Sequence, residues 1–131
     1  MPLMTVRSSI RAWYAAFAVT TIVLGLWIHR GGVTMGAIAR DFFGDALWAM
    51  MVAWWIAALA PGARVLARGA VALAICFAVE FGQLLHTPGL DAFRRTTVGH
   101  LLLGNGFDPR DLVAYVSGVV GAVLFERLVR R

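Results

Sequence analysis

Four long apolar runs limit what this 131-residue chain can fold into. They cover residues 12–28, 46–60, 69–85 and 112–125. A soluble helical bundle would show a polar stripe on every helix at a period of 3.6 residues, and the second run has none. Each run, extended slightly at its ends, approaches the roughly 20 residues that a helix needs to cross a bilayer. We therefore expect an all-α polytopic membrane protein with four transmembrane helices, at 11–29, 44–60, 68–86 and 110–128.

Composition excludes the other large classes of protein. Hydrophobic residues make up 60% of the chain and charged residues 15%, whereas soluble domains carry about 25% charged residues. The chain is too short for two domains, so we expect one membrane domain over 1–131. Its single cysteine, Cys76, excludes an internal disulfide. The arginines lie between apolar runs and not in one basic stripe, so we expect no nucleic-acid partner.

The arginines also predict how the helices are oriented. Four spans place both termini on one side of the membrane, together with seven arginines: Arg7, Arg11, Arg64, Arg68, Arg127, Arg130 and Arg131. The other side holds five arginines and all five aspartates: Arg30, Arg40, Arg94, Arg95, Arg110, Asp41, Asp45, Asp91, Asp108 and Asp111. Cytoplasmic loops are enriched in arginine, so we expect a protein of the bacterial cytoplasmic membrane with both termini on its cytoplasmic side. The first run lacks a following A-x-A site and is expected to be retained rather than cleaved.

The longest connection, residues 87–109, is expected to lie on the outer side. It contains a short apolar stretch at 98–103 that is flanked by glycines. This stretch is too short to cross a bilayer. It predicts a short interfacial or re-entrant helix.

Glu80 is the only acidic, basic or histidine residue inside the four runs. At a rise of about 1.5 Å per residue it lies roughly 9 Å below the outer end of its span, and Gln83 shares its helix face. An ionisable residue inside a membrane most often faces a partner or a water-filled cavity. The alternative is a neutral glutamic acid that hydrogen-bonds a neighbouring helix.

Arg94 is a candidate partner of Glu80. The turn at 87–89 can fold the following segment back over the end of the third span. An ion pair would keep Glu80 charged. Alternatively, Arg94 and Arg95 extend their guanidinium groups to lipid phosphates.

The aspartates have two interpretations. Asp108, Pro109 and Asp111 suit the start of a helix, and Asp45 and Asp91 also precede helical segments, so each can be a cap. The functional alternative rests on their gathering on the side toward which Glu80 opens. Tyr115 lies one turn beyond Asp111 on the same helix face.

Other constellations point to packing rather than chemistry. His29, His86 and His100 are separated by 57 and 14 residues, which fits no compact ligand motif, so we expect no metal and no cofactor.

Ala114, Gly118 and Ala122 recur every four residues. Such small-residue stripes let helices approach closely. The stripe predicts helix packing and could also support a homo-oligomer.

The polar motifs together resemble the VanZ-like membrane proteins. They are Glu80-x-x-Gln83, Asp91-x-x-Arg94, Asp108-x-x-Asp111 and Tyr115-x-x-Gly118-x-x-Gly121. Two longer segments are more similar to a small bacterial membrane family, domain-of-unknown-function family 2809. They are Gly44-Asp45-Ala46-Leu47-Trp48 and Leu101-x-Leu103-Gly104-x-Gly106-Phe107. The resemblance covers about 11–121. VanZ-like proteins are associated with resistance to teicoplanin-type glycopeptides, so the resemblance implies a role in the cell envelope. One departure is Ala114-Tyr115, where the VanZ pattern often has Asn.

These features predict an outward-facing site that binds a membrane lipid or a lipid-linked or polar envelope molecule. Glu80, Gln83 and Arg94 would form its floor, and Asp45, Asp111 and Tyr115 its rim. One alternative is an intramembrane enzyme that uses Glu80 as a general base and an outer aspartate as the acid. Another is a structural or assembly subunit whose polar residues hold helices together.

Overall fold

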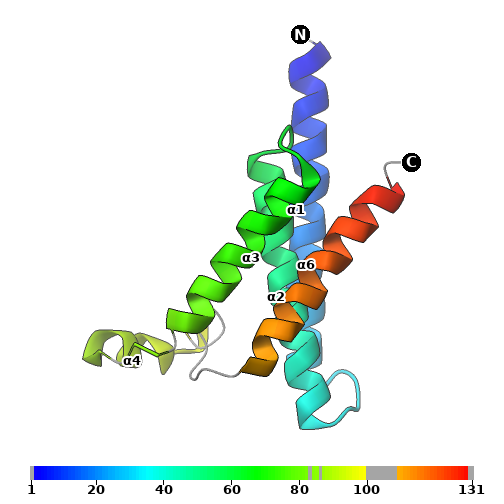
Figure 1. Cartoon of the computed structure of the whole chain (residues 1–131). Helices are drawn as coiled ribbons and strands as arrows, with labels where there is room; N and C mark the ends of the chain where they lie inside the picture. The colour runs from blue at the N-terminus through cyan, green and yellow to red at the C-terminus, as the bar shows by residue number, and fades with distance from the viewer. Residues whose placement is uncertain (1, 83, 86, 100–108, 130–131) are drawn as a thin grey trace.

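The computed structural model describes residues 2–82, 84–85, 87–99 and 109–129. Within these residues the named elements are all helices (Figure 1): α1 (Pro2–His29), α2 (Ala37–Leu59), α3 (Val65–Gly82), α4 (Pro88–Arg94) and α6 (Pro109–Val129). The predicted all-α fold is confirmed. The chain contains four long helices and, between α3 and α6, short helical structure.

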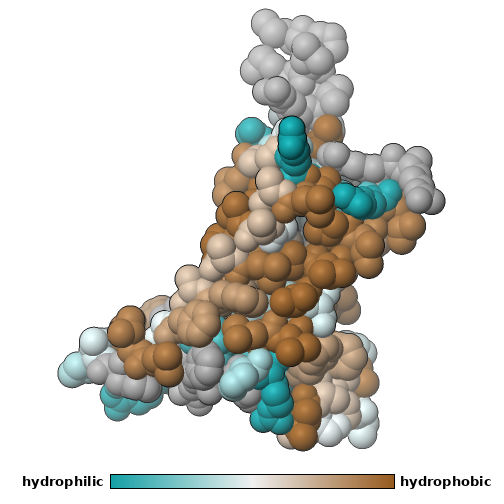
Figure 2. Space-filling model, in the orientation of Figure 1, coloured by the Kyte–Doolittle hydropathy of each residue, from teal (hydrophilic) through white to brown (hydrophobic). Residues whose placement is uncertain are grey.

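The four long helices are apolar and long enough to cross a membrane, over Ser8–His29, Ala37–Leu59, Val65–Gly82 and Pro109–Val129. In Figure 2 the hydrophobic surface forms a broad middle zone, with hydrophilic residues toward the two ends of the molecule. The chain is therefore a multi-pass membrane protein. Both termini lie at one end, here called the terminal end, and α4 lies at the opposite end, here called the α4 end (Figure 1).

Helix α2 begins at Ala37, about two turns before the predicted start at residue 44. Gly36 occupies the N-cap position, with an extended backbone at φ −65° and ψ 161°. The cap interpretation of Asp45 is therefore wrong, because its carboxyl group lies inside the helix. The segment 37–43 contains helix-favouring Ala and Arg, and it continues α2 beyond the apolar run.

Helix α2 is the centre of the packing. It lies against α1, α3 and α6, and α3 also packs on α6. The shared core is made mostly of small and aromatic side chains: Tyr14, Ala18, Ala49, Ala53, Trp54, Ala57, Ala72, Cys76, Tyr115, Val119 and Ala122. Lipid tails are as apolar as these side chains, so the hydrophobic effect does not drive the helices together. Close packing of the helix backbones does so instead, and small residues allow it.

The small-residue stripe of α6 is covered within the chain. Ala114, Gly118 and Ala122 are all buried. A Cβ added to Gly118 would lie 2.0 Å from the carbonyl oxygen of Ala46, so the two backbones are in direct contact. The packing interpretation of this stripe agrees with the structure. The face suggested for a second copy of the chain is already occupied by α2.

Helix α4 begins differently from the prediction. The Thr87 hydroxyl caps it by accepting a hydrogen bond from the Leu90 N–H at 3.2 Å, and Pro88 follows in the first turn. Asp91 lies in the first turn and is not the N-cap. Figure 1 shows α4 running across the direction of the long helices. Most of the apolar stretch at 98–103, and Asp108, lie outside the described residues.

Candidate functional site

Among the described residues, Glu80 is the most deeply buried acidic side chain at the α4 end, with 1% of its surface exposed. It lies near the end of α3, and its Oε2 accepts a hydrogen bond of 2.9 Å from the Tyr115 hydroxyl on α6. Tyr115 is also buried, so it belongs to the floor of the cluster rather than to its rim. The contact joins α3 to α6 inside the membrane-spanning region.

Asp45 and Asp111 complete an acidic cluster with Glu80. The half-buried Asp45 carboxyl shares a hydrogen bond with the Asp111 carboxyl, and it lies within electrostatic range of Glu80 and Asp41. Asp111 stands in the first turn of α6, where a carboxylate is favoured by the helix dipole. Three separate helices thus bring acids to one place, which helix capping alone does not require. We call Asp45, Glu80, Asp111 and Tyr115 the acidic cluster.

Trp48 adds a hydrogen-bond donor beside this cluster. Its ring lies 5.8 Å from the Tyr115 ring, centroid to centroid. Its Nε1 atom is buried and has no hydrogen-bond partner among the described residues. Buried donors are nearly always satisfied by protein, water or ligand. This nitrogen therefore favours a polar occupant near the cluster.

Arg94 has a different role from the predicted pairing with Glu80. One guanidinium nitrogen donates to the Leu85 carbonyl oxygen at 2.7 Å, and the other donates to the Gly82 carbonyl oxygen at 2.9 Å. It also lies 3.4 Å from the Asp91 carboxylate. Arg94 is buried in this position, so it does not extend to lipid phosphates either. It binds the carbonyl end of α3, where a cation is favoured by the helix dipole.

These contacts predict what removal of Arg94 does. In Arg94→Ala, α4 loses its polar attachment to the end of α3, while the four long helices keep their packing. We expect residues 88–94 to exchange amide hydrogens at least tenfold faster, because stability is local and this segment is short. Hydrogen exchange with mass spectrometry measures this. Arg95→Ala, which changes a neighbouring exposed arginine, is the matched control and should leave the exchange nearly unchanged.

The other predicted site residues are placed as follows. Gln83 lies outside the described residues, as do His86 and His100. In the described part of the chain, no three His, Cys, Asp or Glu side chains are arranged to hold a metal ion. The acidic cluster consists of carboxyl groups and one phenol, and the guanidinium of Arg94 is engaged by backbone carbonyls outside it.

A second polar cluster lies at the terminal end, and the sequence analysis missed it. Arg68 on α3 donates to Glu126 Oε1 on α6 at 2.7 Å, and both side chains are buried. The Tyr14 hydroxyl donates to the same oxygen, and the Arg68 guanidinium carbon lies 5.3 Å from the centre of the Tyr14 ring. Glu80 is therefore not the only acid buried in the bundle. Arg68 does not contribute a free positive charge to this end.

The four-residue spacing of the buried residues on α3 and α6 indicates this second cluster. On α3 the buried residues Arg68, Ala72, Cys76 and Glu80 recur every four positions. On α6 the stripe of Ala114, Gly118 and Ala122 continues at the same spacing to Glu126. Residues four apart share a helix face. If the four-residue spacing is continued past the ends of the apolar runs, it reaches Arg68 and Glu126. It therefore predicts that both charged side chains lie in the interface between α3 and α6.

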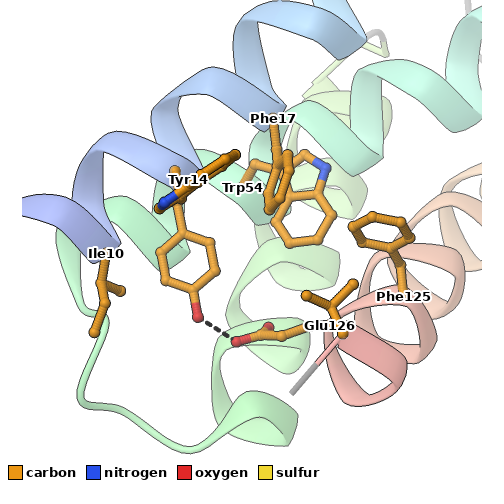
Figure 3. Close-up of a pocket in the computed structure, with 8 residues that line it drawn as sticks. Ile10, Tyr14, Phe17, Trp54, Phe125 and Glu126 are labelled. Carbon is orange, nitrogen blue, oxygen red and sulfur yellow. Dashed lines mark hydrogen bonds between the residues drawn. The ribbon is translucent and has the colours of Figure 1, made fainter. Parts of the chain in front are cut away.

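An aromatic groove opens beside the second cluster (Figure 3). Its volume is about 480 Å³, within the usual range for ligand pockets. It is lined by side chains from α1, α2 and α6: Ile10, Trp13, Tyr14, Phe17, Trp54, Phe125, Glu126 and Val129. The rings pack on one another, with Phe17 5.1 Å from Trp54 and 5.5 Å from Phe125.

Comparison with known proteins shows the family of the chain. Residues 34–119 match the family described as protein of unknown function DUF2809. The match covers well over half of the chain and includes α2, α3, α4 and the first half of α6. The chain belongs to this family. No solved structure matches it.

Proposed function

We propose that this DUF2809 protein binds the polar part of a lipid-linked or polar cell-envelope molecule at its acidic cluster, in the bacterial cytoplasmic membrane. The observation that carries the proposal is the convergence of Asp45, Glu80 and Asp111 from three helices around the Tyr115 hydroxyl. Burying acids inside a membrane bundle is costly, and intramembrane acids mark functional sites. The expected orientation of the helices places this cluster on the outer side.

The chemistry of the cluster selects the kind of group that it binds. Carboxylate oxygens accept hydrogen bonds. The guanidinium of Arg94 is held by the carbonyls of Gly82 and Leu85 and so is not presented as a phosphate clamp. The cluster therefore suits a ligand that offers donors, such as the hydroxyl, amide or ammonium groups of an envelope precursor. The buried Trp48 Nε1 supplies one donor for an acceptor on the same ligand.

The resemblance to the VanZ-like proteins extends this proposal to antibiotic tolerance. In those proteins an acidic ExxQ helix and an acid-rich last helix go with resistance to teicoplanin-type glycopeptides. These antibiotics act on the cell envelope, which is where a ligand of the acidic cluster would be found.

Co-purification tests the proposal directly. The protein is purified from bacterial membranes in mild detergent, and the lipids that remain bound are identified by mass spectrometry. We expect the wild type to retain a polar envelope lipid. Glu80→Gln and Asp45→Asn should retain at least tenfold less, since hydrogen bonds to charged groups contribute about 1.5–3 kcal/mol each.

Asp91→Asn is the matched control, because it changes an acid at the same end of the molecule but outside the cluster. It should keep the lipid. Equal lipid retention by the wild type, Glu80→Gln and Asp45→Asn would contradict the proposal. A loss of thermal stability in Glu80→Gln and Asp45→Asn without any lipid-dependent difference would favour the alternative of a structural subunit. Turnover of the bound lipid by the wild type, absent in Glu80→Gln, would favour an enzyme.

A further inference from the structure

Four large apolar side chains are exposed in and around α4, outside the four long helices. Leu84, Leu85 and Val98 are each 61% exposed, and Phe93 is 42% exposed. None of them belongs to a membrane span, so the need to cross the bilayer does not explain them. A concentration of exposed apolar side chains marks an interaction surface.

Arg94 fixes the level at which α4 lies relative to the membrane. Its guanidinium donates to the carbonyl oxygens of Gly82 and Leu85, at the end of α3. Helix α3 has 18 residues. At a rise of 1.5 Å per residue it is about 27 Å long, close to the roughly 30 Å thickness of the hydrocarbon core. The end of α3 at Gly82 therefore marks the boundary of that core, and Arg94 holds α4 at this boundary.

Helix α4 has one apolar face and one polar face. Leu90 and Phe93 are three residues apart and share a face. Asp91 and Arg95 are each two residues from Phe93, about 200° around the helix, so they lie on the other face. Figure 2 shows this division, with hydrophobic residues on the side of α4 toward the terminal end and hydrophilic residues on the opposite side. The apolar side of α4 therefore faces the level of the spans.

We propose that α4 binds the lipid surface of the leaflet at the α4 end as an anchor that lies in the membrane plane. Its apolar side chains would lie among the acyl chains just inside the headgroups, and Asp91 and Arg95 would lie among the headgroups. A lipid surface is the occupant because α4 lies across the long helices at the level where they leave the hydrocarbon core (Figure 1). The exposed apolar side chains are thus continuous with the surface of the spans that lipid already covers. This surface needs neither the acidic cluster nor its ligand.

Spin labelling tests the proposal, because the single cysteine of the chain, Cys76, is fully buried. The full chain is placed in phosphatidylcholine nanodiscs with a nitroxide on Phe93→Cys or on Arg95→Cys, both exposed positions. Electron paramagnetic resonance measures collisions of the label with oxygen, which concentrates in lipid, and with a water-soluble nickel complex. We expect the ratio of oxygen to nickel collisions to be about fivefold or more higher at position 93, because the apolar face of an interfacial helix lies roughly 5–10 Å inside the headgroup boundary.

Two further labels give the reference values. Val120→Cys, at an exposed position midway along α6, reports lipid, and Gly62→Cys, in the turn between α2 and α3, reports water. Position 93 should lie closer to the lipid reference. A ratio at position 93 equal to that of Gly62→Cys would overturn the proposal, because α4 would then project into water. Broadening of the spectrum by a second label nearby, without a lipid-like ratio, would assign the surface to a second copy of the chain and would also overturn it. Glu80→Gln should leave the ratio at position 93 unchanged, so this result is independent of the function proposed for the acidic cluster.

Discussion

Glu126→Ala is expected to lower the free energy of unfolding by about 3–5 kcal/mol, because it leaves the buried Arg68 guanidinium without its carboxylate. Arg68 is only 4% exposed, and its Nη2 donates to Glu126 at 2.7 Å. The Tyr14 hydroxyl loses its acceptor at the same time. Chemical unfolding in detergent micelles, followed by tryptophan fluorescence, measures the change.

The double variant Arg68→Met with Glu126→Leu isolates the cause. A buried ion pair replaced by apolar residues of similar volume is often neutral or stabilising. We therefore expect the double variant to recover most of the stability that Glu126→Ala loses. Arg127→Ala is the control on the neighbouring, exposed position and should unfold like the wild type. If Glu126→Ala alone is as stable as the wild type, the pair is not a buried constraint of the fold.

The two polar clusters are best understood as the two ends of one helix interface. Arg68 and Glu80 mark the ends of the buried face of α3, and each contacts α6. Between them lie the small buried residues Ala72 and Cys76 of α3. Polar contacts at both ends fix the register of α3 against α6, because these small side chains offer little shape to set it. The position of the acidic cluster therefore depends on this whole interface.

Hydropathy predicted the four spans because crossing a bilayer demands about 20 apolar residues per helix. The same measure misplaced the helix ends. It started the second span at residue 44, whereas the helix begins at Ala37 and carries Asp45 inside. The predicted fourth span, 110–128, agrees with α6 (Pro109–Val129), but the apolar run at 112–125 on which it rests ends before Glu126. Helix ends follow backbone hydrogen bonding and caps, which extend beyond the apolar segment.

Four of the six predicted site residues lie together in the acidic cluster, but the contacts between them could not be predicted. The common side of Asp45, Glu80, Asp111 and Tyr115 followed from the number of spans. The partner of each side chain did not, because it depends on which helices pack together. Glu126 lies 58 residues from Arg68 in the chain. Arg94 donates to the carbonyl oxygens of Leu85 and Gly82, so the backbone at the end of α3, and not Glu80, is its partner.

The second large prediction concerns the contact between α2 and α6. In Gly118→Ala the new Cβ would lie 2.0 Å from the Ala46 oxygen and 2.8 Å from the Ala46 carbonyl carbon, so one backbone must move. We expect the free energy of unfolding to fall by about 2 kcal/mol or more, the upper range for overpacking in a well-packed core. The chemical unfolding assay described above measures it.

The sign of the change in unfolding free energy distinguishes a close helix contact from an open position. Alanine is favoured over glycine inside a helix by up to about 1 kcal/mol, so Gly118→Ala would stabilise α6 if the position were open. Gly44 on α2 is such a position, with no atom within 4 Å of an added Cβ, and Gly44→Ala should raise stability. Gly121→Ala meets only the flexible end of Met50, at 3.1 Å, and should fall between the two. The order Gly44, Gly121, Gly118 from stabilising to destabilising is specific to direct backbone contact between α2 and α6. A stabilising Gly118→Ala would mean that these helices are farther apart, and that Asp45 and Asp111 do not share one site.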